Sequence, residues 1–490
     1  MAVNGEHRML IDGELVEAAS GATYENINPA NEEVLGVTAD ASAEEVKRAV
    51  SAARRAFDET NWSRDPAFRR RCLEQLHQAM DKHREEFRET LVAEGGTPVA
   101  ITYSVSIDEC INAFPFYAQL ADTYEYERDR GTQASAGLPS AARTIKEPVG
   151  VVGAITPFNF PLMLALGKIG PALAAGCTVV HKPAIETPWT ATLLGRLVAE
   201  ETDMPAGVFN VVPTSSNDVA EALVVDPAVD MITFTGSSRI GKRILAITAD
   251  HIKRVHLELG GKSAAIVLDD ADFGTAIGML STMACAHSGQ ACARHTRMLL
   301  PRARYDEGVE FASALFSSLA AGDPTDASVL HGPEITARHR DTVISQVERA
   351  EAEGARIAAR GSKPDTDKGF WLEPTLLTDV DPDSATAQEE IFGPVLAVMP
   401  YDDDDHAVAI ANNSSYGLSG GVWSADEERA MAFARRIRAG TVSINMSMFV
   451  HAQWPFGGYK QSGLGRENGV EGFEEFLETK LITTPGSLDG

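Results

Sequence analysis

The sequence predicts an α/β fold that contains a doubly wound parallel sheet and a second α/β domain. From Pro148 onward, short apolar strands alternate with helices, which is typical of a parallel sheet covered on both faces. A second run of alternating strands and helices begins after Gly260 and Gly261. The 490 residues also exceed what one simple core accommodates, so two or three domains are expected.

The first part of the chain predicts a hairpin and a group of helices. An Asp-Gly pair between apolar runs predicts the hairpin over residues 10–16. A capping box at Ser42–Glu45 starts one helix, and apolar residues at helical spacing predict two more over 66–94 and 107–122. Residues 131–147 are rich in Gly, Ser and Ala and predict an extended hairpin or an excursion from the domain.

The alternating part of the chain predicts the elements of the two sheets. In the first run, strands are expected at 149–155, 178–181, 208–212, 231–235 and 254–257, with helices at 162–174, 188–201, 218–224 and 238–248. In the second run, strands are expected at 264–268, 297–300, 395–399 and 441–445, and loops at 363–369, 379–384 and 402–405. The tail predicts a short helix after Gly472 and an edge strand over 480–485.

Composition excludes several classes of function. With 70 acidic and 43 basic residues the net charge is −27, which disfavours nucleic acids and anionic membranes as partners. Five scattered cysteines without a CxxC pair indicate a reducing compartment and neither a disulfide framework nor a zinc site. The N-terminus lacks a signal-peptide pattern, and the apolar stretch Val149–Val180 is broken by prolines, glycines and Lys168. We therefore expect a cytoplasmic protein without a membrane span.

No metal site is expected either. The run Asp402–Asp405 is the densest acidic cluster, but potential partner ligands are lacking nearby in the sequence. A solvated loop or a helix cap explains it better.

Cys292 is the first candidate for a catalytic residue. An apolar helical pattern ends at Ser288-Gly289, and Ala291 and Ala293 flank the cysteine, so its thiol lies on a turn with an open approach. A free thiol has a pKa near ~8.5, and a nucleophilic site must lower that pKa or supply a base. The alternative is a small buried hydrophobic residue.

Two further candidates lie at predicted strand ends. Asn159 is in a turn pinned by Pro157 and Pro161, and a rigidly held amide can donate to a developing oxyanion. Its alternative role is to cap the next helix. Glu258 ends a buried strand and could act as a general base if burial raises its pKa. The alternative for this glutamate is an ion pair with Lys262.

A candidate phosphate site lies at the same sheet edge. The turn Gly236–Gly241 joins a strand to a helix, whose free N–H groups, with the Ser237 hydroxyl, would suit an anion. Lys182 follows a neighbouring strand and could contact a ribose or a phosphate. A plain strand–turn–helix corner and a solvated lysine are the alternatives.

A series of motifs spans nearly the whole chain. The motifs are Thr156-Pro157-Phe158-Asn159-Phe160-Pro161, Phe234-Thr235-Gly236-Ser237, Leu257-Glu258-Leu259-Gly260-Gly261-Lys262, Gly289-Gln290-Ala291-Cys292, Glu389-Glu390-Ile391-Phe392-Gly393-Pro394 and Pro455-Phe456-Gly457-Gly458-Tyr459-Lys460-Gln461-Ser462-Gly463. In type, order and spacing they resemble the motifs of the aldehyde dehydrogenase superfamily, in its NAD(P)-dependent, hydrolytic branch.

The resemblance implies oxidation of an aldehyde to a carboxylic acid. Cys292 would attack the carbonyl, and the Asn159 side chain and the Cys292 backbone N–H would hold the thiohemiacetal oxyanion. Hydride transfer to the nicotinamide would leave a thioester. Glu258 would then activate the water that hydrolyses this thioester.

The resemblance also implies the residues of the ligand sites. Lys182 and Ser237 would bind the adenosine ribose and the pyrophosphate, Glu390 would hold the nicotinamide ribose, and Phe392 would pack nearby. The full cofactor set is Ile155, Thr156, Pro157, Phe158, Lys182, Gly236, Ser237, Leu259, Glu390 and Phe392. The substrate set is Phe160, Met163, Leu164, Gly167, Ala291, Val450, Trp454 and Phe456.

Two departures from the family pattern concern the substrate pocket. Gly167 stands where many relatives carry an aromatic residue, and Phe158 replaces the commoner tryptophan. We therefore expect a roomy apolar tunnel for medium-chain, aromatic or terpenoid aldehydes.

The family architecture implies three regions and an oligomer. Residues 1–124 and 148–258 would form the dinucleotide-binding domain and residues 259–462 the catalytic domain. Residues 125–147 and 463–490 would form an oligomerisation region of a homodimer or homotetramer.

Other departures leave alternatives open. Many NAD-preferring relatives carry a glutamate where this chain has Ile185, and Glu186 comes one residue later, so NAD is favoured while NADP stays possible. Arg294 and His295 could lower the pKa of the nucleophile or point away from it.

Two other functions are less favoured. A coenzyme-A-acylating enzyme is disfavoured because that branch typically lacks the Glu258 base. A non-enzymatic structural protein is disfavoured because nucleophile and base are both kept.

Overall fold

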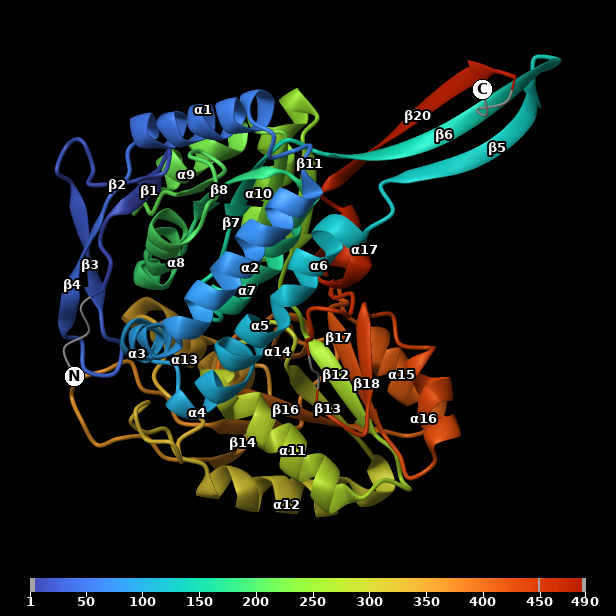
Figure 1. Cartoon of the computed structure of the whole chain (residues 1–490). Helices are drawn as coiled ribbons and strands as arrows, with labels where there is room; N and C mark the ends of the chain where they lie inside the picture. Colours follow the sequence, from blue (N-terminus) through green and yellow to red (C-terminus); the bar gives the residue numbers. More distant parts are fainter. Residues whose placement is uncertain (1–4, 448–449, 487–490) are drawn as a thin grey trace.

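The computed structural model describes residues 5–447 and 450–486, which form four β-sheets and the helices around them (Figure 1). Two large sheets form the body, and a long three-stranded sheet projects from it (Figure 1). The predicted α/β fold is confirmed. The proposed residue boundaries between domains stay a prediction.

The first large sheet has eight strands. They are β1 (Met9–Ile11), β2 (Glu14–Val16), β7 (Val151–Ile155), β8 (Thr178–Lys182), β9 (Phe209–Val211), β10 (Met231–Thr235), β11 (Arg254–Glu258) and β19 (Gly463–Leu464). Their order is β19-β11-β10-β7-β8-β9-β1-β2, and β7 to β11 are parallel. From β7 the strand order continues through β8 and β9 on one side, whereas β10 and then β11 lie on the other side of β7. Ligands of doubly wound sheets bind at the carboxyl ends of the strands beside such a reversal.

Helices cover both faces of this sheet. One face packs against α2 (Pro66–Lys82), α6 (Pro115–Thr123), α7 (Pro161–Ala175) and α8 (Pro188–Glu201). The other face packs against α1 (Ala43–Glu59), α9 (Asn217–Val225) and α10 (Ser238–Thr248). Alternate strand residues explain this division, because Val152 and Ala154 point to the first face while Val151 and Ile155 point to the second.

The second large sheet has seven strands. They are β12 (Ser263–Val267), β13 (His295–Pro301), β14 (Arg356–Arg360), β15 (Thr375–Thr378), β16 (Val395–Tyr401), β17 (Ser419–Trp423) and β18 (Thr441–Ile444). Their order is β14-β15-β16-β13-β12-β17-β18, with only β14 antiparallel to its neighbour. The flanking helices are α11 (Phe273–Cys285), α12 (Tyr305–Ser318), α13 (Ala337–Ala352), α14 (Ala385–Gln388), α15 (Asp404–Asn412) and α16 (Glu427–Ala434).

The remaining strands form two small sheets. β5 (Glu127–Ser135) and β6 (Leu138–Pro148) are the hairpin expected near residues 131–147, and β20 (Leu477–Pro485) pairs with β6 as the expected edge strand. A short helix, α17 (Gly469–Glu474), precedes β20. β3 (Thr23–Ile27) and β4 (Val34–Ala39) form a separate pair.

Two predicted helices are broken in the structure. The helix expected at 66–94 is α2 followed by α3 (Arg84–Gly95), because the backbone of His83 leaves the helical range with φ −101° and ψ 19°. The helix expected at 107–122 is α5 (Asp108–Ala113) followed by α6, which begins at Pro115, a residue without an N–H for a continuous helix.

The acidic run Asp402–Asp405 is a helix cap. The Asp403 side chain accepts the N–H of His406 at the start of α15. Arg302 and Arg429 pair with neighbouring aspartates of the run. Within residues 5–447 and 450–486, no group of side chains is arranged to hold a metal ion. None of the helices in that part of the chain has the length and apolar character of a membrane span.

Candidate active site

The three candidate catalytic residues come from separate elements and meet at the carboxyl edge of the eight-stranded sheet. Asn159 follows β7, and its side-chain amide donates to the Gln290 carbonyl at 2.9 Å. Glu258 is the last residue of β11. Three residues later, a Cβ at Gly261 would lie only 2.6 Å from the Cys292 carbonyl oxygen, so only glycine lets the two backbones meet.

A strained turn presents Cys292. After α11, His287, Ser288 and Gly289 have φ values of 53°, 57° and 69°, all in the left-handed region. In the two non-glycine residues, His287 and Ser288, such a backbone costs of order 1–3 kcal/mol each and persists only where neighbours hold it. At Gly289 glycine is obligatory, because a Cβ would lie 2.1 Å from the Gly393 carbonyl oxygen.

A strap formed by residues 330–335 holds this turn. The Leu330 carbonyl accepts the His287 N–H at 2.7 Å, and the Ser288 hydroxyl donates to the Gly332 carbonyl at 2.8 Å. The Gln290 side chain accepts the Ile335 N–H at 3.1 Å. The backbone that leads into Cys292 is therefore fixed by contacts from outside the turn.

Asn159 is held at both ends. It is buried, its amide bonds to Gln290, and its carbonyl contacts the His287 ring at 2.6 Å. The alternative cap role is not what the geometry shows, because the N-cap of α7 is Phe160 and has no side-chain cap bond. Among the described residues, only one of the two amide hydrogens has an acceptor, so the other can bind another acceptor.

Glu258 is fully buried, with 0% of its surface exposed. Neither carboxylate oxygen has a hydrogen-bond partner in the described part of the chain, so the alternative ion pair with Lys262 is absent there. Burial raises the pKa of Glu258 well above its usual range, and the Glu467 carboxylate raises it further while Lys168 opposes the shift. A carboxyl with a raised pKa can accept a proton near neutral pH.

Lys168 and Glu467 form a buried ion pair beside Glu258 that the sequence analysis did not identify. The Thr235 hydroxyl also donates to Glu467 at 3.4 Å. A lysine inside the otherwise apolar helix α7 was the available signal. Its partner, 299 residues away, has no sequence signal of its own.

The thiol of Cys292 is half-buried and protonated at rest. Burial raises its pKa well above 9.0, and the Glu258 and Glu390 carboxylates raise it further. His295 does not offset this, because burial lowers its pKa to about 4 and its ring packs against Gly421 in the second sheet. Arg294 stays cationic at neutral pH, since burial lowers its pKa only to about 10.

The candidate phosphate site lies at the N-terminus of α10. Ser237 is the N-cap residue, and its hydroxyl accepts the Ile240 N–H at 3.4 Å. A Cβ at Gly236 would lie 2.4 Å from the Phe234 ring, so any other residue there would have to displace this ring. Ile155, Thr156 and Leu259 end or follow the neighbouring strands β7 and β11.

Lys182 ends β8, and its charge interacts with that of Glu186. Burial lowers the pKa of Lys182, and the Glu186 carboxylate opposes this shift. Burial raises the pKa of Glu186, and Lys182 opposes that shift in turn. Ile185, the position of the missing glutamate, is exposed. The structure therefore supplies a carboxylate beside Lys182 from the next residue along the chain.

The Glu390 carboxylate packs against the backbone of Gly260 and Gly261. It accepts the Gly261 N–H at 3.1 Å, and a Cβ at Gly260 would lie 2.2 Å from it. Burial raises the pKa of Glu390 to about 7. Phe392 has a left-handed backbone with φ 57°, and its ring meets that of Phe158 edge to face, with centroids 6.0 Å apart.

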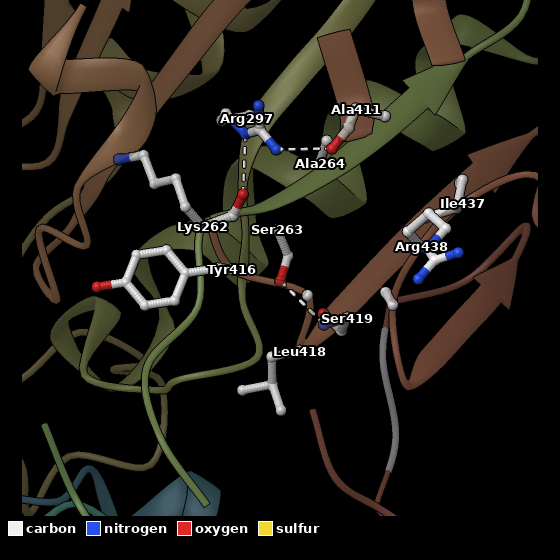
Figure 2. A pocket seen from close by; sticks show the side chains of 12 residues that line it. Lys262, Ser263, Ala264, Arg297, Ala411, Tyr416, Leu418, Ser419, Ile437 and Arg438 are labelled. Carbon is white, nitrogen blue, oxygen red and sulfur yellow. Dashed lines mark hydrogen bonds between the residues drawn. The ribbon is translucent and has the colours of Figure 1, made fainter. Parts of the chain in front are cut away.

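Lys262 belongs to a neighbouring pocket. Figure 2 shows the Arg297 guanidinium donating to the Lys262 carbonyl, at 2.8 Å, in a pocket lined also by Ser263, Tyr416 and Ser419. Burial lowers the pKa of Lys262 to about 7.

Most of the expected substrate residues form two apolar clusters beside Cys292. Phe160, Met163, Leu164 and Ala291 share one cluster with Ile101 and Val105. Val450 and Phe456 share the other with Cys292, Ala293 and Leu418.

Two of the expected substrate residues lie outside both clusters. Gly167 faces Asn468 and Glu467, at 3.6 and 3.9 Å from the position of a Cβ. Trp454 is 61% exposed on a loop, next to the His451 ring.

Comparison with known proteins assigns the family. The sequence model described as Aldehyde dehydrogenase family matches residues 15–482. The chain belongs to the aldehyde dehydrogenase family. Its members include a 3-succinoylsemialdehyde-pyridine dehydrogenase of a Pseudomonas species, 40% identical over 96% of this chain and 97% of the relative. A geranial dehydrogenase of Castellaniella defragrans is 38% identical over 98% of this chain and 99% of the relative.

Solved structures agree with this family. The crystal structure of a betaine aldehyde dehydrogenase from Staphylococcus aureus, in complex with NAD+, superposes with a TM-score of 0.94 at 37% identity. The match covers 98% of this chain and 95% of that one. The chain is thus an oxidoreductase of the aldehyde dehydrogenase family.

The raised pKa of Cys292 predicts how its reactivity depends on pH. Only the thiolate reacts with iodoacetamide, so alkylation of Cys292 in the ligand-free protein should accelerate at a pH well above the pKa of an ordinary thiol, near ~8.5. Glu258→Gln removes one negative charge and should shift this midpoint downward. Peptide mass spectrometry at Cys292 measures the rate, with Cys292→Ala as the background. A midpoint below 8 in the unsubstituted protein would contradict the electrostatics of the site.

Proposed function

We propose that this protein oxidises medium-chain, aromatic or terpenoid aldehydes to carboxylic acids with NAD+, through a covalent intermediate on Cys292. The observation that carries the proposal is the convergence of a fixed thiol, an oriented amide and an unpaired buried carboxyl. These groups are Cys292, Asn159 and Glu258.

The first half of the reaction forms the covalent bond. The Cys292 thiol releases its proton to solvent, its sulfur adds to the aldehyde carbon, and the carbonyl oxygen takes up the negative charge. The free amide hydrogen of Asn159 and the Cys292 backbone N–H donate to this oxyanion. Donors of this kind are worth ~10²–10³ in rate, because they are oriented before the charge develops.

The second half releases the acid. Bound NAD+ supplies the acceptor for the hydride that leaves the thiohemiacetal carbon. The Cys292 thioester that results is hydrolysed by water, whose proton passes to Glu258. A glutamate with a raised pKa is matched to this step, because a stronger base takes a proton from water more readily.

The residues at the sheet edge fit a dinucleotide. The N-terminus of α10 offers N–H groups to a pyrophosphate, beside Ser237. Lys182 and Glu390 would hold the two riboses. One carboxylate oxygen of Glu390 accepts the Gly261 N–H, and its second oxygen would accept from a ribose hydroxyl. Phe158 and Phe392 would pack near the nicotinamide.

NAD+ is favoured over NADP+ by charge. The carboxylate of Glu186 lies beside Lys182 and would repel a 2′-phosphate on the ribose that Lys182 binds. The solved Staphylococcus aureus relative with NAD+ supports the same choice.

The apolar surroundings of Cys292 support this substrate class. The two clusters beside Cys292 are apolar, and a long or cyclic aldehyde would find apolar side chains in both of them. Relatives named geranial dehydrogenase and benzaldehyde dehydrogenase, at 38% and 37% identity, support terpenoid and aromatic aldehydes.

The projecting sheet is the proposed contact of a homodimer or homotetramer. Its apolar side chains Leu138, Leu481 and Ile482 are exposed in the single chain. The edge strand β20 also carries unpaired backbone groups on one side.

Steady-state kinetics tests the reaction and the substrate class. We expect reduction of NAD+ with benzaldehyde, octanal and citral at a kcat/KM at least tenfold above that with acetaldehyde, because only the larger aldehydes fill the apolar clusters. Cys292→Ala should abolish the reaction. If none of these aldehydes led to reduction of NAD+ or NADP+, or if turnover required coenzyme A, the proposal would be overturned.

Cofactor preference tests the role of Glu186. Glu186→Gln removes the repulsion of a 2′-phosphate and should raise the ratio of kcat/KM for NADP+ over NAD+ by about tenfold, equal to roughly 1.4 kcal/mol. Glu200→Gln removes the same charge from an exposed site of α8 and should leave the ratio unchanged. An equal shift in both variants would show that net charge alone, and no local contact, sets the preference.

A further inference from the structure

We propose that Arg88 and Asp108 are positioning residues that set substrate selectivity by holding a π-helical turn against the pocket. The turn is η1 (Thr102–Ser106), between α4 (Val99–Ile101) and α5. The inference rests on the proposed function, since it concerns the aldehydes that reach Cys292.

The turn is irregular at its centre. Ser104 has φ −129° and ψ −126°, which interrupts the helical backbone. Single π-helical turns are rare and are frequently found at functional sites. An interruption of this kind needs contacts from outside to keep one conformation.

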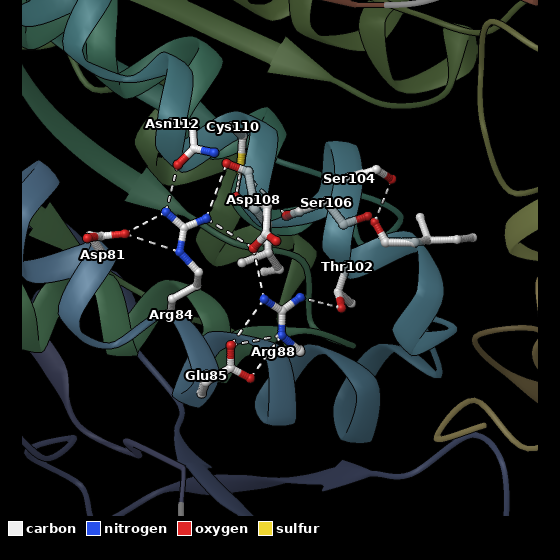
Figure 3. Close-up of polar contacts among 12 residues, drawn as sticks. Asp81, Arg84, Glu85, Arg88, Thr102, Ser104, Ser106, Asp108, Cys110 and Asn112 are labelled. Atoms are coloured by element: carbon white, nitrogen blue, oxygen red, sulfur yellow. Dashed lines mark hydrogen bonds and ion pairs between the residues drawn. The ribbon is translucent and has the colours of Figure 1, made fainter. Parts of the chain in front are cut away.

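One arginine fixes both ends of the turn. The guanidinium of Arg88, from α3, donates to the Thr102 hydroxyl at 2.7 Å and to the Asp108 carboxylate at 2.8 Å (Figure 3). The Thr102 hydroxyl donates in turn to the Val99 carbonyl at 2.6 Å. Thr102 begins the turn and Asp108 follows it, so both ends are tied to the same rigid group.

The centre of this network is buried, although Asp108 is 25% exposed and Glu85, which also accepts from Arg88 at 3.0 Å, is 70% exposed. The Arg88 side chain is 5% exposed, and Arg84 adds a second bond to Asp108 at 3.0 Å (Figure 3). Burial raises the pKa of Asp108, but the bonds from Arg88 and Arg84 outweigh this and hold the pKa below its usual value. Because Glu85 stays paired with Arg88, loss of the Asp108 carboxylate would release one end of the turn without leaving the guanidinium uncompensated.

The turn forms one wall of the apolar space beside the nucleophile. Ile101 and Val105 pack in one cluster with Phe160, Leu164, Met163 and Ala291. Phe160 adjoins Asn159 and Ala291 adjoins Cys292 in the sequence. A long or cyclic aldehyde bound at Cys292 would extend along this wall, whereas acetaldehyde has no atoms that reach it.

Comparing kcat/KM for octanal with kcat/KM for acetaldehyde distinguishes a size-dependent loss of activity from a general loss of activity. Thr102→Val keeps the shape of the side chain but removes the hydroxyl that Arg88 holds, and Asp108→Asn weakens the other end. Both variants should lose about tenfold in kcat/KM for octanal, mainly through KM. The kcat/KM for acetaldehyde and the KM for NAD+ should stay within twofold. Arg70→Ala is the matched control, because Arg70 pairs with Glu74 and Asp122 and bonds neither end of the turn.

A readout independent of turnover accompanies the kinetics. The rate at which N-octyl iodoacetamide alkylates Cys292, divided by the rate with iodoacetamide, should change at least threefold in Thr102→Val and not in Arg70→Ala. Equal losses for octanal and acetaldehyde, or an unchanged octanal value together with an unchanged alkylation ratio, would overturn the inference. If the unsubstituted protein oxidises no aldehyde, the proposed function fails, and the alkylation ratio still decides whether the turn forms the wall.

Discussion

Three successive left-handed residues, His287, Ser288 and Gly289, place the Cys292 thiol. This backbone is costly by itself, and the strap of residues 330–335 holds it through hydrogen bonds to the turn. The strap also fixes the proposed oxyanion donor, because the Asn159 amide bonds to Gln290, whose side chain accepts from the strap. The Cys292 thiol and the Asn159 amide thus share one support.

The second constraint is electrostatic. Burial raises the pKa of Cys292, the carboxyls of Glu258, Glu390 and Glu467 raise it further, and one nearby cation, Lys168, is paired with Glu467. The resting thiol is therefore protonated, and Glu258 has a raised pKa of its own. This arrangement protects the thiol from chance alkylation and leaves a strong base beside it. The cost is one buried carboxyl without a hydrogen-bond partner among the described residues, which the proposed role of Glu258 as a base would explain.

Sequence patterns predicted the features that depend on residues close together in the chain. Strands and helices of the first sheet follow from apolar periodicity, and the motifs after β7, β10 and β11 fall at one edge because parallel strands end there together. Contacts between distant residues carry no such signal. Three such contacts arise only from packing. They are the Lys168–Glu467 ion pair, the interaction of Glu186 with Lys182, and the bonds of Arg88 to the two ends of the π-helical turn. Strand β17, with Gly420 and Gly421, was missed because glycines weaken a strand pattern.

The most direct test of the account is to trap the intermediate on Cys292. Glu258→Gln keeps the thiol and the amide but lacks the base, so incubation with benzaldehyde and NAD+ should yield one equivalent of NADH and a stable benzoyl thioester. Peptide mass spectrometry should locate the benzoyl group on Cys292, while the unsubstituted enzyme should turn over without accumulating it. Full turnover by Glu258→Gln, or acylation of a residue other than Cys292, would contradict the roles assigned to these groups.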